Sequence, residues 1–414
     1  MKIRIFTVAA LAALLALPGS TGRAAPEGIL AVVWHGYDAR LARVAPLSLD
    51  PLGGQGVALG RQTSGVGRSA FTWAFSPDAS QVAVGGRLLG GLRIADVSRL
   101  RMRARIGLWA EPLAWLTPRR LLAGEQTDLN YAPDRIVVID PVRRRVVTRR
   151  RLVGSIVRIA SSRDRLALLL APTHRIGSAR VSVADSSGRI RSAVLARIPA
   201  GIAVDERSHS GRSEYPALTV DPDAGRAFVV GSAPLVAEID LRTAAVRYHQ
   251  LGVPTLKLGA GSTRSAAWLG DGVFAVAGTD ARVSTDQGGN EQEVSTPAGL
   301  RLIDTRTWTA RNADPKAAWF AVADGLVLAF GWSWSSETDV RPGMGVGAYT
   351  RTGELRFHVF GEDPVSAVQA ASGYAYVARI GSPGTAVVGL ASGRVVAMLE
   401  RSMPYLLVPG QTPY

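Results

Sequence analysis

FTWAFSPDASQVAVGGRLLGGLRIAD, residues 71–96, decides the fold, because most of the chain after it is a degenerate copy of this stretch. The stretch is predicted to contain three strands. The turn sequence SPDAS separates the first strand from the second, and the third stops at Asp96. These three predicted strands are Phe71–Phe75, Gln81–Val84 and Leu92–Ala95. A fourth strand near Arg103–Gly107 would complete an antiparallel sheet of about four strands, the size of one propeller blade.

The repeated feature is an apolar pair that ends in aspartate and precedes a tight turn and another apolar strand. Copies end at Asp50, Asp96, Asp140, Asp185, Asp240 and Asp304, and two later copies end at Thr350 and Leu390 instead. Most intervals are about 40 to 50 residues, which is typical of propeller blades. The chain is therefore predicted to be all-β, a single β-propeller of eight four-stranded blades. Seven blades is the alternative, if one long interval hides a misassigned anchor.

The two ends of the chain complement each other. Only three strands are predicted before the first full copy, over Ile29–Trp34, Arg40–Leu49 and Gly56–Leu59. The chain finishes with an isolated first-strand copy, YLLVPG, at residues 405–410. We expect the N- and C-terminal strands to share one closing blade, which leaves no open ring edge.

The repeat VIDPVRRRVV, residues 138–147, resembles the YVTN-type repeat of exported propellers. More distantly it resembles the WD-repeat and quinoprotein dehydrogenase-like propellers. The resemblance covers essentially the whole mature chain and implies a fold rather than an activity. The WD dipeptide is absent, and only TGELRF, residues 352–357, approaches a quinoprotein docking repeat, without its tryptophan. No cofactor is predicted.

The first 24 residues have the pattern of an export signal. Lys2 and Arg4 precede the apolar run Ile5–Leu17, and small residues lead to a cleavage site after Ala24. The run is shorter than the roughly 20 residues that a membrane span needs. The expected division is a signal peptide over 1–24 and a propeller over 25–414, with a retained signal-anchor as the alternative. The mature protein is expected to be secreted, periplasmic or in the cell envelope, with no integral membrane segment.

Composition excludes several kinds of site. The chain has no cysteine, so disulfides, thiolate metal sites and a cysteine nucleophile are excluded. Its net charge is +15, and nearly all of the positive charge is arginine. A GC-rich genome or attraction to an acidic partner would each explain this balance. Nucleic acid is not expected as a partner of an exported chain. The arginines cluster only at 143–145 and 149–151, which is either a solvated edge or an anionic docking patch.

Long insertions fall on one side of the predicted ring. In antiparallel four-stranded blades, connections from second to third strand and connections between blades emerge on the same face. The insertions of these two types are residues 124–134, 171–178, 198–215, 251–264, 278–298 and 331–345. This loop-rich face is the predicted binding surface.

Five residues on these insertions are binding candidates: Tyr131, His174, His209, Trp332 and Trp334. The two tryptophans would stack on a sugar ring or an apolar side chain, or alternatively fill the neck of the ring. The two histidines are more typical of solvated loops than of metal ligands, because no short ligand pair accompanies them. No metal site is predicted.

Motifs for catalysis are missing from the sequence, which has no GxSxG, no GK[ST] phosphate loop and no GxGxxG after a strand. The chain is therefore predicted to be a monomeric binding scaffold for a protein or a cell-envelope glycan. The alternative is a propeller enzyme of the lactonase-like or dehydrogenase-like type with a site at the channel mouth. The sequence assigns no catalytic residue.

Overall fold

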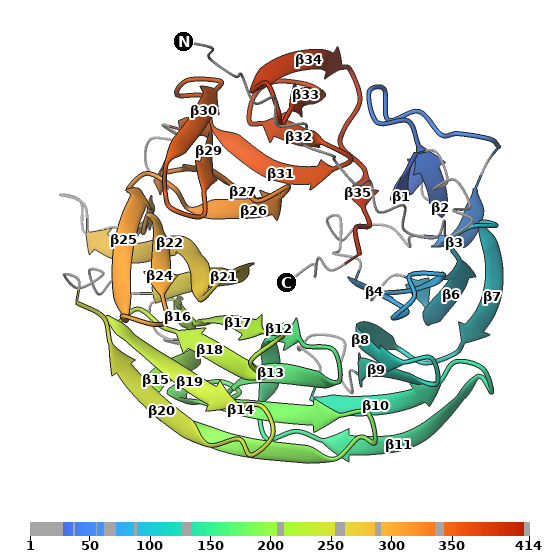
Figure 1. Ribbon diagram of the computed structural model, residues 1–414, viewed down its shortest axis with the longest axis horizontal. Coiled ribbons are helices and arrows are strands. Elements are labelled where there is room, and N and C mark those ends of the chain that lie inside the picture. The colour runs from blue at the N-terminus through green and yellow to red at the C-terminus, as the bar shows by residue number, and fades with distance from the viewer. Residues whose placement is uncertain are drawn as a thin grey trace, which may run out of the picture.

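The computed structural model describes residues 28–409 except 36–37, 55, 62–71, 87–88, 126–133, 205–210, 253–260, 286–290 and 336–342. Its named elements, β1 to β35, are all strands. They form sheets arranged around a centre, as Figure 1 shows. The prediction of a single all-β propeller is confirmed. The predicted signal peptide lies outside the described residues, and within them no helix is long and apolar enough to cross a membrane.

Six sheets contain four antiparallel strands each. The closing sheet consists of β3 (Val57–Arg61), β2 (Asp38–Val44), β1 (Ile29–His35) and β35 (Tyr405–Leu406). The next two sheets are β4 (Thr72–Phe75), β5 (Gln81–Gly85), β6 (Leu92–Asp96) and β7 (Arg101–Ile106), then β8 (Ala110–Thr117), β9 (Arg120–Glu125), β10 (Arg135–Asp140) and β11 (Arg145–Arg151). The fourth is β17 (Ala217–Asp221), β18 (Arg226–Val230), β19 (Leu235–Asp240) and β20 (Val246–Gln250). The last two are β26 (Trp319–Ala323), β27 (Leu326–Trp332), β29 (Gly343–Thr350) and β30 (Leu355–Val359), then β31 (Val365–Ala371), β32 (Tyr374–Arg379), β33 (Thr385–Gly389) and β34 (Arg394–Leu399).

The remaining strands form one sheet of eleven. Its members are β12 (Ser155–Ser161), β13 (Arg165–Ala171), β14 (Ile176–Asp185), β15 (Ile190–Val204), β16 (Gly211–Tyr215), β21 (Gly261–Gly270), β22 (Val273–Thr285), β23 (Glu291–Pro297), β24 (Leu300–Asp304), β25 (Thr309–Asp314) and β28 (Trp334–Ser335). The predicted count of eight separate blades is therefore not confirmed, since six four-stranded blades stand alone. The reason is that segments expected to be loops pair with one another and merge two modules that lie on either side of the β17–β20 sheet.

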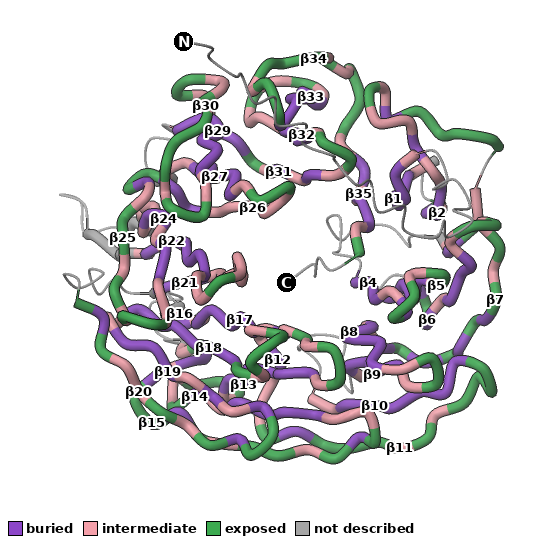
Figure 2. Tube along the Cα trace, viewed as in Figure 1, coloured by how far each residue is buried: buried purple, intermediate pink, exposed green. Residues whose placement is uncertain are grey.

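The sheet of β4 to β7 has the strands that the sequence of residues 71–96 and of the segment after it predicts. Thr72–Phe75, Gln81–Gly85, Leu92–Asp96 and Arg101–Ile106 pair in order as one meander. Its inner three strands are apolar on both faces because a neighbouring sheet covers each side. Ala83, Leu92 and Ile94 pack on the β8–β10 sheet, whereas Val82 and Val84 pack on the closing sheet. Figure 2 shows the result around the ring, with buried inner strands and exposed outer ones.

The ring closes where the two ends of the chain meet. Strand β35 pairs antiparallel with β1, with Leu406 opposite Ala31 and Tyr405 opposite Val32. The amide of Leu407 also donates to the carbonyl of Leu30 at 2.8 Å. The prediction that N- and C-terminal strands share the closing blade is confirmed.

The repeated aspartates hold the turns between third and fourth strands. The Oδ1 atom of Asp140 accepts hydrogen bonds from the amides of Val142 and Arg143, both at 3.0 Å. Asp240 does the same for the amides of Arg242 and Thr243, at 2.9 and 2.7 Å. A carboxylate that accepts backbone amides two and three residues ahead fixes a tight turn. The aspartate repeat is therefore explained by turn structure, with no functional role required.

Acid is expected to weaken the fold through these turns. Hydrogen bonding from the Arg99 amide, the Ser98 hydroxyl and Arg103 lowers the pKa of Asp96 to about 2. A depressed pKa stabilises the fold at pH values above the ordinary range of the carboxyl group, and that stability disappears as the pH falls toward 2. Asp96→Ala should cost about 1 to 2 kcal/mol at pH 7. Urea unfolding at a series of pH values should show the variant and the parent converging near pH 2. A deficit that stays constant with pH would contradict this role, and Asp223→Ala, at a turn where the side chain is 79% exposed, is the matched control.

Candidate functional site

The insertions on one face join into a continuous strip of paired strands, here called the bridging strip. It consists of residues 176–178, 199–204, 211–215, 261–264, 279–285, 291–297 and 334–335. The start of β14 pairs with the end of β15, and β15 continues to β16. Strand β16 then pairs in parallel with β21, which leads through β22 and β23 to β28. The strip therefore links connections that belong to successive modules of the ring.

This strip corrects the expectation of separate long loops. Residues 291–297 and 279–285 form a hairpin, and residues 201–204 extend β15 by pairing with β16. The connection from Ala171 to Ile176 is short, because β13 and β14 extend into the predicted insertion. Most of the predicted insertion at 124–134 lies outside the described residues. The backbone groups of these segments satisfy one another by strand pairing, which sequence periodicity does not reveal.

A buried ion pair lies under the centre of the strip. The Arg264 side chain is 1% exposed, and its Nη2 atom donates to Oδ1 of Asp280 at 2.5 Å. Its Nη1 atom donates to the carbonyls of Thr263 and Thr279, at 3.1 and 2.7 Å. Gly278 leaves room for this side chain, since a Cβ there would lie 2.9 Å from Cδ of Arg264 and closer still to the Thr263 carbonyl. The guanidinium thus ties the start of β21 to the middle of β22.

Further charged groups extend this network to neighbouring strands. Arg158 on β12 donates from Nε and Nη2 to the carbonyl of Arg264, at 3.2 and 3.0 Å. Burial lowers the pKa of Arg158 and of Arg301, and for Arg301 the nearby Arg264 acts in the same direction. Desolvation raises the pKa of Tyr215, an effect that the charge of Arg158 opposes. The network therefore spans β12, β16, β21, β22 and β24.

A buried carboxylate closes the network at the parallel junction. Glu214 on β16 is 2% exposed, and its Oε2 atom accepts hydrogen bonds from the hydroxyls of Ser262 and Ser232, at 2.5 and 3.4 Å. Ser262 lies directly opposite Glu214 in the β16–β21 pair, whereas Ser232 follows β18. The side chain therefore fastens the strip to the blade that the strip crosses.

The predicted binding residues lie at opposite ends of the strip. His174 is exposed in the turn between β13 and β14, at a φ of 60°. Trp334 belongs to β28, where its backbone pairs with Ser295 at the far end. Trp332 is half-buried, with its ring centroid 4.4 Å from that of Trp319 on the innermost strand β26. Tyr131 and His209 lie outside the described residues. The described candidates do not converge on one point.

Sequence reasoning missed the charged network on this face, which consists of the buried Glu214, Arg264 and Asp280 and the half-buried Arg158. Arginine is so common in the chain that one buried arginine carries no sequence signal. Among the described residues, no three histidine or carboxylate side chains are grouped as metal ligands would be. The arrangement supplies hydrogen bonds and charge pairs that fix the shape of the strip.

Comparisons with known proteins agree on architecture alone. No family model and no curated protein matches the chain. Among solved structures, the dihydro-heme d1 dehydrogenase NirN in complex with DHE has a TM-score of 0.54 at 16% identity, covering 93% of this chain and 75% of that one. BamB from Moraxella catarrhalis has a TM-score of 0.46 at 12% identity, with 85% and 88% covered. Sqt1 from Saccharomyces cerevisiae has 0.49 at 11%, with 80% and 85% covered. The likeness to NirN, at 16% identity, concerns the fold alone and agrees with the all-β propeller described above.

Proposed function

We propose that the protein is an exported binding scaffold that engages a protein or a cell-envelope glycan through the face carrying the bridging strip. The observation that supports this most is the strip itself, in which connections from successive modules are paired instead of separate. A preorganised surface binds without a large ordering cost, because its backbone is already held. The four-stranded sheets are complete without these extensions, so closing the ring does not require them.

The buried network supports the same proposal. Taking Arg264, Asp280 and Glu214 out of water is costly, and apolar residues of similar size would often stabilise a fold as well or better. Buried charges are better suited to fixing one geometry than to adding stability. We infer that they hold the register of the strip, so that its outer surface has one shape. A fixed register is what a recognition surface requires and a loose loop lacks.

We also propose that the ring is built from eight modules. Two quartets within the eleven-stranded sheet, β12 to β15 and β21-β22-β24-β25, have the same order as a separate blade. Together with the six separate sheets, these quartets make eight four-stranded units among the described residues. One apolar cluster lies between each unit and the next, and the eighth lies between the β31–β34 sheet and the closing sheet. The bridging strip connects two of these quartets, which accounts for their fusion into one sheet.

Photo-crosslinking tests the proposed binding face. Ile202 lies in the strip with 40% of its surface exposed, whereas Leu355 lies on the outermost strand β30 with 51% exposed. A benzophenone amino acid is placed at either position in the full-length chain, which is then expressed in its native cells. We expect a discrete crosslinked species from position 202 and none from position 355. The species should disappear when Asp is introduced at neighbouring strip position 203 in place of Ala203.

Two results would overturn the proposal. Equal crosslinking at both positions would show non-specific contact, and no crosslinking at 202 in cells that produce the protein would show an unoccupied face. Purified peptidoglycan fragments, added in vitro to the same variants, separate a glycan ligand from a protein ligand. A glycan should give the crosslink in the absence of any other protein.

A further inference from the structure

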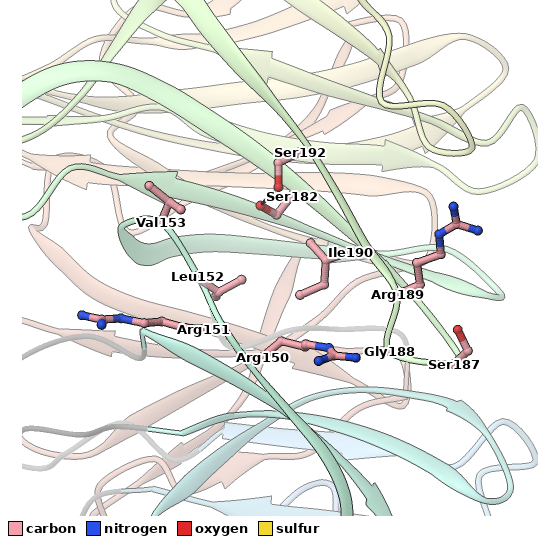
Figure 3. Close-up of a pocket in the computed structure, with 10 residues that line it drawn as sticks. All are labelled: Arg150, Arg151, Leu152, Val153, Ser182, Ser187, Gly188, Arg189, Ile190 and Ser192. Carbon is pink, nitrogen blue, oxygen red and sulfur yellow. Dashed lines mark hydrogen bonds between the residues drawn. The ribbon is translucent and has the colours of Figure 1, made fainter.

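A groove lies on the outer rim between β11 and the β14–β15 hairpin. It has a volume of about 440 Å³, and Arg150, Arg151 and Arg189 are its charged residues. Figure 3 shows Arg150 directed along the groove toward Gly188, with Arg151 directed away from it and Arg189 on the opposite wall. Leu152 and Ile190 form the apolar floor, and the hydroxyls of Ser182 and Ser192 bond to each other at 2.7 Å.

Gly188 lets this groove form at the turn. A Cβ at this position would lie 2.6 Å from Cγ2 of Val138 and 3.0 Å from Cγ2 of Thr148, on the neighbouring sheet. The residue also has a φ of 81°, which side-chain-bearing residues rarely adopt. The turn from Asp185 to Arg189 therefore lies directly against β10 and β11. This close approach brings Arg189 next to the arginine tract of β11.

A second groove lies on the other face of the β14–β15 hairpin and shares Arg189 with the first. It has a volume of about 140 Å³ and lies between the β14–β15 hairpin and the turn after β19. Its charged residues are Arg165, Asp185, Arg189, Arg191 and Arg242. The side chain of Arg191 crosses it and donates from Nη1 to the carbonyl of Arg242. Because Arg189 borders both grooves, the two form one basic path across the rims of three successive modules.

Three arginines of this path have no acidic partner among the described residues, whereas Arg165 pairs with Asp164 at 3.4 Å. Arg150, Arg151 and Arg189 are exposed, and their side chains make no ion pair with any residue that the structure describes. The nearby Glu125 is paired with Arg149 instead. The carboxylate of Asp185 is engaged by its own turn, accepting from the amides of Ser187 and Arg189 at 2.9 and 3.1 Å. Acceptors for these guanidinium groups must therefore come from outside the chain or from water.

Another groove between two modules is not basic. A groove of about 450 Å³ between the closing sheet and the β31–β34 sheet is bordered by Asp50, Glu400 and Arg401. There Arg401 pairs with Asp50 at 2.6 Å, and Glu400 leaves the lining with one net negative charge. The two arginine-lined grooves thus differ from an equivalent position on the same ring. Their charge is local to the rim between β11 and β20.

We propose that this basic path binds a flexible, linear polymer with repeated phosphate groups. Guanidinium groups form paired hydrogen bonds with phosphate oxygens, and successive arginines match successive charges along a chain. Both grooves of the path are concave, and they meet at Arg189. A narrow polymer chain fits into such grooves better than the flat surface of a bilayer does. The proposal concerns the rim and is independent of the function proposed for the bridging strip.

Binding of fluorescent inorganic polyphosphate to the full mature chain tests this proposal. We expect affinity to fall steeply with salt, because bound counterions are released from the polymer. Arg150→Gln with Arg189→Gln should weaken binding by at least about tenfold, since each removes charged hydrogen bonds. The slope of log affinity against log salt should fall by about one for each arginine removed. Arg189→Lys keeps the charge and should give an intermediate affinity.

The matched control is Arg394→Gln, which removes the same charge from β34, another outermost strand on the far side of the ring. It should leave affinity within about twofold, because a rim-wide charge effect is weak at physiological salt. Equal losses in the control and in the double variant would overturn the proposal. It would also be overturned by orthophosphate competing as well as polyphosphate at equal phosphate concentration, or by binding to anionic phospholipid vesicles without binding to polyphosphate. Thermal unfolding of each variant confirms that these exposed substitutions leave the fold intact.

Discussion

Replacing Arg264 with methionine is expected to lower the free energy of unfolding by about 3 kcal/mol, because the buried Asp280 loses its bonded cation. Breaking a buried pair in this way typically costs about 3 to 5 kcal/mol. The lower end is expected here, since Arg301 also acts on Asp280 electrostatically. The carbonyls of Thr263 and Thr279 lose a donor as well. Urea unfolding at pH 7 measures the change.

An exposed pair supplies the matched control. Arg163 and Asp223 are 3.4 Å apart, with 86% and 79% of their side chains exposed. Arg163→Met should cost less than about 1 kcal/mol, because water screens such a pair. If Arg264→Met costs no more than this control, the buried pair does not hold the strip. A second variant, Arg264→Met with Asp280→Leu, should recover part of the loss, because it leaves no buried charge unpaired.

The location of faster hydrogen exchange distinguishes a local role of the Arg264–Asp280 pair from a general contribution to stability. Amide hydrogen exchange in Arg264→Met should accelerate first in β16 and in residues 261–264 of β21, which the network holds together. Exchange in β31 to β34, on the other side of the ring, should change only as far as global stability changes. Uniform acceleration would indicate that the pair stabilises the whole fold and does not act on the strip.

The module pattern was predictable because its signals are local. Asp96 and Asp140 fix turns by bonding to their own neighbouring amides, so their effect is visible in a few consecutive residues. Apolar strands between such turns follow from burial on both faces. The closing blade was also predictable, because YLLVPG matches a first strand that lacks partners in its own part of the chain. Each of these features depends on short stretches of sequence.

The bridging strip was not predictable for the opposite reason. Glu214 meets Ser262, and Arg158 meets Arg264, across separations of 48 and 106 residues. Polar segments such as EQEVSTP carry no strong strand signal, and their pairing depends on where the ring places them. The same pairing fused modules that the repeat pattern counts separately. The sequence indicated which connections are long, while their strand structure and the buried charges beneath them required the tertiary fold.

Removing the last strand is expected to have the other large effect. Leu406 and Leu407 are each 2% exposed and belong to different apolar clusters. Leu406 packs with Tyr376 and Val387 on one neighbouring sheet, whereas Leu407 packs with Trp73 and Val82 on the other. Two residues of the chain therefore join three sheets. Leu→Ala substitutions at such positions cost about 2 to 5 kcal/mol each.

Side chains from the adjacent sheet reinforce this joint. The amide of Gln369 on β31 donates to the Pro404 carbonyl, and its Oε1 atom accepts from the Leu406 amide, both at 2.8 Å. Tyr376 donates to the carbonyl of Pro46 at 2.8 Å, joining two segments 330 positions apart. These bonds connect the closing sheet to the β31–β34 sheet, with which it has no strand pairing. The closing blade is consequently held from both its edge and its face.

Leu407→Ala should therefore lower the free energy of unfolding by about 3 kcal/mol, and truncation before Met403 by more than the single variant. Leu355→Ala, at a leucine that is 51% exposed, should cost less than about 1 kcal/mol and serves as the matched control. Hydrogen exchange at Ala31 and Val32 on β1 should accelerate in the truncated chain, because their strand partners are gone. An unchanged urea midpoint on truncation would mean that the ring holds without its last strand. The truncated chain should also self-associate at high concentration, since the exposed edge of β1 is then free to pair with another copy.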